Sequence, residues 1–263
     1  MTADPVSPRD LVALPRAAAL MLWTAAYQRG DIGPDDAADL SYGVSRSGPS
    51  AQEDATDLFA WMTGLRRLPL AQLRLVLPVP GRIAGLVGPP PAISAALHAE
   101  QAIVVTAAGI ADHTLVPELG PAEVPATRSG AILWRRFPAP VGAQLSPAAS
   151  SGTARQELLE AMRRAARSST DLDLVPDEPV EPSRVPPTWT ATELPAHIDA
   201  QQSHLLVLAS RTLLLTRAEL EDGSAHTRQL SQEQERRRLL AELHDAAREA
   251  VVEAVEQIAH AVS

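Results

Sequence analysis

The stretch Leu73-Arg74-Leu75-Val76-Leu77 decides the fold class, because it places a strand in a chain that begins with helical patterns. It is short and apolar, which suits the pleated, half-buried surface of a sheet. Pro78 and Pro80 follow at once, and proline lacks the amide hydrogen that would continue a strand ladder. The sequence therefore predicts a strand at 73–77 that ends before Pro78.

Helices and further short strands lie on both sides of this stretch. Apolar residues recur every three or four positions at 9–29 and 52–68, which predicts two helices. After the Gly- and Pro-rich segment that follows the strand, the pattern predicts a short helix at 92–100 and strands at 103–105, 114–116 and 131–137. Helices before and between short strands predict an α+β domain over 1–145 with a small mixed sheet.

The rest of the chain alternates between helical patterns and a segment rich in proline. A helix is predicted at 151–168, and the acidic, proline-rich composition of 170–193 predicts a linker. Two long helical patterns close the chain over 194–263, joined by the turn Asp222-Gly223. We expect them to form an antiparallel helical hairpin, so the predicted fold class is a helix-rich α+β fold closed by that hairpin.

The composition excludes several kinds of site and partner. The chain has 263 residues and no cysteine, which excludes disulfides, thiolate zinc sites and cysteine nucleophiles. Acidic residues number 32 against 23 basic ones, and a net charge of −9 argues against a broad surface for the nucleic-acid backbone. The sequence shows no export signal and no apolar run long enough for a bilayer. We therefore expect a cytoplasmic protein with no nucleic-acid partner and no membrane insertion.

Several short strings are similar to those of a known family. The likeness is carried by 73–81, by Gly85-Leu86-Val87-Gly88-Pro89-Pro90, by Ile132-Leu133-Trp134-Arg135 and by the turn of the last two helices at 217–223. Together they resemble a family of uncharacterised actinobacterial proteins. The resemblance covers most of the chain in outline and implies a cytoplasmic bacterial protein. It implies no activity, ligand or catalytic residue.

The segment 235–245, Glu-Arg-Arg-Arg-Leu-Leu-Ala-Glu-Leu-His-Asp, carries the motif with the most specific chemistry. It resembles the phosphoacceptor box of one class of two-component histidine kinases. That resemblance implies His244 as the nucleophile and Asp245 as the acid that holds the imidazole tautomer. Leu240 and Ala241 depart from the family pattern. Since 18 residues follow Asp245, we expect neither a second dimerisation helix nor an ATP-binding domain, and no autophosphorylation.

Other candidate residues favour structural roles. The sequence predicts that His197, Gln201 and His204 share one face of a helix, but two turns separate the histidines, too far for one metal ion. Gly81, Gly85 and Gly88 match no phosphate-loop pattern, and prolines follow them directly. The pair Asp112-His113 is a weak acid–base candidate, and glutamates offset the basic run 236–238. We therefore predict no cofactor, no metal site and no catalytic residue.

Two functions remain open at this point. The favoured interpretation is a non-enzymatic interaction or regulatory protein that binds another protein through a helical surface or the acidic linker. The alternative is a degenerate phosphotransfer protein that uses His244 with a kinase supplied in trans. Exposure of His244 separates them, and the apolar seam through Leu240, Leu243 and Ala247 predicts that His244 lies at the edge of the buried face.

Overall fold

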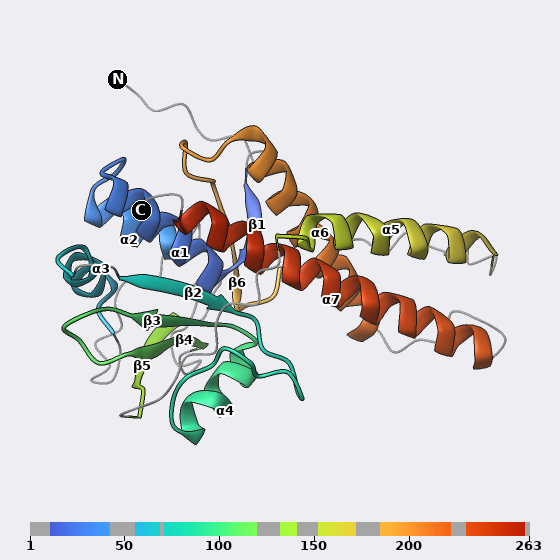
Figure 1. Ribbon diagram of the computed structural model, residues 1–263, viewed down its shortest axis with the longest axis horizontal. Coiled ribbons are helices and arrows are strands. Elements are labelled where there is room, and N and C mark those ends of the chain that lie inside the picture. Colours follow the sequence, from blue (N-terminus) through green and yellow to red (C-terminus); the bar gives the residue numbers. More distant parts are fainter. Residues whose placement is uncertain are drawn as a thin grey trace, which may run out of the picture. The chain divides into compact units, whose positions relative to one another are not determined.

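The computed structural model describes residues 11–42, 56–68, 71–119, 132–140, 152–171, 185–221 and 230–260 (Figure 1). The chain forms two compact units. The first, which we call the sheet unit, comprises Met1–Ala148, Pro186–Asp199 and Val255–Ser263. The second, the helical unit, comprises Ala149–Val185 and Ala200–Ala254.

The main sheet of the sheet unit is a four-stranded antiparallel meander. Its strands are β2 (Gln72–Val76), β3 (Ala102–Thr106), β4 (His113–Leu119) and β5 (Ile132–Pro138), in the order β2-β3-β4-β5. All four were predicted from local apolar runs. Every pairing between described strands is antiparallel, so the predicted mixed sheet is wrong in strand direction. Apolar patterning reports which residues are buried and carries no information on the direction of the neighbouring strand.

Both edges of this sheet accept hydrogen bonds from elsewhere in the same unit. At the β2 edge, the imidazole Nε2 of His260 lies 3.0 Å from the carbonyl oxygen of Leu73. At the β5 edge, the amide of Thr56 donates to the carbonyl oxygen of Trp134 at 2.7 Å. Contacts of this kind shield backbone groups that would otherwise pair with another chain.

A second, two-stranded sheet joins distant parts of the chain. Strand β1 (Val12–Pro15) pairs antiparallel with β6 (Trp189–Thr192), and Pro15 lies opposite Trp189. The sequence predicted neither strand, because the helical pattern at 9–29 covers the first and the predicted linker at 170–193 covers the second. The remainder of that linker, 172–184, lies outside the described residues.

Helix α1 (Arg16–Arg29) is the buried helix of the sheet unit, and its side chains from Arg16 to Tyr27 are all buried. Its first turn is held by Gln101, whose Oε1 accepts the amide of Ala17 at 2.8 Å. It ends at Gly30, whose φ of +86° is left-handed and lets the amide cap the last carbonyl groups. An alanine-rich helix is narrow, so strands and helices approach it from several sides.

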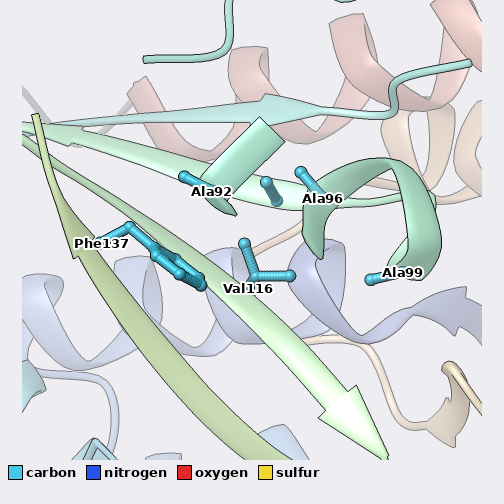
Figure 2. Packing of buried hydrophobic residues seen from close by; sticks show 6 residues of the cluster. Ala92, Ala96, Ala99, Val116 and Phe137 are labelled. Carbon is cyan, nitrogen blue, oxygen red and sulfur yellow. The ribbon is translucent and has the colours of Figure 1, made fainter. Parts of the chain in front are cut away.

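Three shorter helices complete the sheet unit: α2 (Pro34–Tyr42), α3 (Leu58–Arg66) and α4 (Pro90–Ala99). Figure 2 shows how α4 packs, with Ala92, Ala96 and Ala99 directed toward Val116 and Phe137 of the sheet. Small side chains on the helix allow close approach to the strands. Phe137 of β5 contributes the aromatic ring of this cluster.

The helical unit contains α5 (Ala154–Asp171), α6 (Ala200–Glu221) and the part of α7 (Leu230–His260) that ends at Ala254. Two hydrogen bonds show the direction of α6 relative to α7: His244 bonds to Thr216, and Arg236 donates to Glu219. Thr216 lies before Glu219 on α6, whereas its partner His244 lies after Arg236 on α7. The two helices are therefore antiparallel, as the sequence predicted. The helix-rich α+β class with its closing hairpin is confirmed.

The predicted seam of α7 is displaced at its N-terminal end. Ala247 is buried as expected, as is Val251 one turn later, whereas Leu240 and Leu243 are only half-buried. Leu239 is buried in their place. On α6, Leu213 is buried and its neighbour Leu214 is half-buried. At the N-terminal end of α7 the buried leucine therefore lies one residue earlier than predicted.

Candidate functional site

His244 is a half-buried residue of α7, at the edge of the buried face of that helix, and it contacts α6. Its Nδ1 is 3.1 Å from Oγ1 of Thr216. The Thr216 hydroxyl is also 2.8 Å from the carbonyl oxygen of Thr212, one turn earlier on α6. Because a hydroxyl has one proton and the Thr212 carbonyl can only accept, the consistent arrangement has Nδ1–H donating to Thr216. That tautomer leaves the lone pair of the ring on Nε2.

Burial is the main reason that the His244 ring is neutral at pH 7. Burial lowers the pKa of His244 below its ordinary value, and Arg248 and Arg217 lower it further, against the opposing effect of Asp245 and Glu221. The carboxylate of Asp245 lies 3.1 Å from Nη2 of Arg248. In the phosphoacceptor hypothesis Asp245 orients the imidazole, whereas here the bond to the ring comes from Thr216 on the other helix.

The arginine run 236–238 beside this site is surrounded by carboxylates. Arg236 binds Glu219 on α6 and lies near Glu233, while Arg237 binds Glu233 at 3.0 Å. Arg238 pairs with Glu235 at 2.6 Å and also with Glu242. The hydrogen bond from Arg238 lowers the pKa of Glu235. Each guanidinium therefore has an acidic partner within the helical unit, and the run does not present a basic patch.

His113 in the sheet unit has a different environment, with 1% of its surface exposed. Its Nε2 accepts the indole N–H of Trp61 at 3.1 Å, and its Nδ1 lies 3.1 Å from the carbonyl oxygen of Ala111. Both ring nitrogens are thus used in hydrogen bonds, so the Asp112-His113 pair has no ring nitrogen left for acid–base work. The sequence does not reveal the Trp61 partner, because it lies 52 positions away on α3.

His197 does not belong to the helix predicted for it. Helix α6 begins at Ala200, so His197 lies in the preceding turn and does not share a helix face with Gln201 and His204. Its Nδ1 is 3.1 Å from a carboxylate oxygen of Asp31. Within the described ranges, no three His, Cys, Asp or Glu side chains group closely enough to hold a metal ion.

The glycine-rich segment between β2 and α4 is a structural turn. Gly81 and Gly85 have φ values of +83° and +93°. At Gly88 an added Cβ would lie 2.7 Å from the Cβ of Ala92, which is closer than real atoms approach. The hydroxyl of Thr114 donates to the carbonyl oxygen of Val87 and holds this segment against β4. Glycine is required here by backbone shape and close packing.

Comparison with protein families gives a match in the N-terminal part of the chain. Residues 17–151, just over half of the chain, match the family described as Rv1486c-like protein, N-terminal domain. No curated protein matches the chain, and no solved structure does. Among the described helices, none has the length and apolar character needed to cross a membrane. The match confirms the predicted family of no assigned activity: the chain belongs to the Rv1486c-like proteins.

Proposed function

We propose that this protein is a non-enzymatic interaction protein, and that one face of α6 binds another protein. The face consists of His204, Leu208, Arg211 and Leu215, which recur at helical spacing. The observation that carries the proposal is Leu215, a large apolar side chain on α6 with 40% of its surface exposed. Leucines at this spacing are the anchors with which helices bind protein grooves.

The charged residues of the helical unit support an interaction role over catalysis. The arginine run 236–238 is paired with carboxylates, and Arg248 is paired with Asp245 and Glu249. Among the described residues of the helical unit, these arginines are therefore engaged by carboxylates, as is common for solvated surface pairs. Arg211, in contrast, is exposed beside Leu208 and Leu215 on the proposed face. An exposed arginine flanked by leucines is a composition enriched at protein interfaces.

The experiment compares two full-length variants that introduce the same acidic residue. Leu215→Glu places it on the proposed face, and Gln234→Glu places it at an exposed position on α7. Tagged wild type should capture its partner from host extract, Leu215→Glu should lose at least about tenfold in captured partner, and Gln234→Glu should match wild type. Equal capture by both variants, with circular dichroism showing that they are folded, would reject the α6 face.

The second candidate function is phosphotransfer at His244, and one observation favours it. The ring is neutral and its Nδ1 is engaged by Thr216, which leaves Nε2 to attack a phosphoryl group. Incubation with ATP and host extract followed by detection of phosphohistidine tests this candidate. We expect no acid-labile phosphate. Phosphohistidine in wild type that disappears in His244→Gln would favour phosphotransfer over the interaction role.

A further inference from the structure

We propose that the hydrogen bond between Trp61 and His113 is an acid-sensitive latch, which holds α3 against β4 and opens when His113 takes a second proton. The latch lies wholly within the sheet unit. It is independent of the α6 face, so the proposed function and this inference can fail separately.

The geometry requires His113 to be neutral. An indole N–H can only donate, so the Nε2 atom 3.1 Å from Trp61 must accept with its lone pair. The single ring proton is therefore on Nδ1, where it is donated to the carbonyl oxygen of Ala111 at 3.1 Å. The Trp61 indole and the Ala111 carbonyl together therefore require neutral His113 with its proton on Nδ1.

A second proton on His113 would place two donors against each other. The new Nε2–H would point at the indole N–H of Trp61, and neither group has an alternative acceptor in this bond. His113 is 1% exposed and Trp61 is 8% exposed, so water does not separate them without movement. Protonation therefore requires the indole to leave its position on β4, which costs the hydrogen bond and part of the packing of Trp61.

Helix α3 is the element that moves with Trp61. It has nine residues, and its buried face consists of Leu58, Trp61, Met62 and Leu65. A helix of this length is not stable by itself and depends on the packing of that face. Loss of its central aromatic anchor therefore loosens the helix as a whole, while the four strands of the sheet keep their own hydrogen bonds.

Burial and the charges that face His113 place the opening below the ordinary pKa of histidine. Burial is the largest influence and lowers the pKa of His113 below its ordinary value, and Arg136 on β5 lowers it further. The bond to the Ala111 carbonyl and the charge of Asp112, just before β4, oppose this shift. The ring is thus neutral at pH 7 and the latch is closed there.

The test follows the exchange of individual indole N–H protons by NMR in the full chain, from about pH 7 to about pH 4, a range that spans a lowered histidine pKa. Trp23 is an internal control, since its indole donates to the hydroxyl of Thr192 at 3.0 Å, a group that does not titrate. The N–H of Trp61 should exchange at least about tenfold faster at the acidic end relative to that of Trp23.

Two variants keep the inference falsifiable. In His113→Gln the side-chain carbonyl can accept from Trp61 without titrating, so the exchange of Trp61 should lose its acid dependence. Should that variant fail to fold, Trp61→Phe removes the opposing donor, and the pKa of His113 should rise. Retained protection of Trp61 throughout the acidic range would overturn the latch. Loss of protection at Trp61 and Trp23 together would also overturn it, because global unfolding would then explain the result.

Discussion

The sheet unit and the helical unit each contain an adjacent pair of histidine and aspartate, and the two pairs have different environments. In Asp112-His113 the ring is buried and both nitrogens are hydrogen-bonded. In His244-Asp245 the ring is half-buried, and the bond that holds it comes from Thr216. One partner of His113 lies 52 positions away in the chain and the partner of His244 lies 28 positions away, so the dipeptide alone does not show what either ring contacts.

The difference shows what a histidine needs before a chemical role can be assigned to it. In neutral His113 both ring nitrogens are hydrogen-bonded, which indicates a structural contact. His244 keeps one nitrogen, but the acid beside it is paired with Arg248. A dipeptide that suggests acid–base chemistry in the sequence therefore has two different meanings within one chain.

The largest expected effect tests the core of the sheet unit. Trp134 on β5 is 1% exposed. Trp134→Ala removes a large buried ring, and we expect a loss of about 3–5 kcal/mol in the free energy of unfolding. Chemical denaturation followed by circular dichroism measures this loss. A cost below about 1 kcal/mol would mean that the sheet does not depend on this ring.

The next effect compares two neighbouring leucines on α6. Leu213 is buried and Leu214 is half-buried. Leu213→Ala should lower the free energy of unfolding by about 2–3 kcal/mol, and Leu214→Ala by about half as much, because less apolar surface leaves water at that position. Thermal and denaturant unfolding of the two variants checks this order. A larger loss for Leu214→Ala than for Leu213→Ala would contradict the assignment of Leu213 to the buried face of α6.

An intermediate effect depends on pH and concerns His113. The pKa of His113 is lower in the folded state than in the unfolded state. Between these two pKa values the folded state therefore binds fewer protons than the unfolded state does. Stability is therefore complete above about pH 6.5 and falls as the pH approaches the folded pKa, by up to about 1.4 kcal/mol per pH unit. Denaturation of wild type at several pH values should show this fall. In His113→Gln the corresponding part of the pH dependence should be absent.

The smallest expected effect is at His244. His244→Gln retains a hydrogen-bonding side chain at a half-buried position, so the free energy of unfolding should change by less than about 1 kcal/mol. Denaturation of this variant beside wild type measures the change. A loss above about 2 kcal/mol would show that the bond to Thr216 is central to the α6–α7 contact and would remove the contrast with His113.

Local patterns along the sequence determined most of the secondary structure. Apolar periodicity predicted the long helices, and the runs around Leu75, Val104 and Leu115 predicted strands that the structure confirms. These features depend on neighbours within a few positions, which is the range that helical and strand periods describe. The candidate sites were predicted only as residue types, since local spacing does not report which side chain meets another across the fold.

The tertiary structure alone decided the pairing of β1 with β6 and the antiparallel direction of every described strand. It also decided which side chain meets each histidine, Trp61 on α3 for His113 and Thr216 on α6 for His244. Each depends on groups that are far apart in the chain and close in space. Val12 pairs with Thr192 because folding makes the burial of both strands favourable together, although neither has a strong pattern of its own. The sequence by itself therefore determined which segments form helices and the four main strands, and long-range packing decided what they touch.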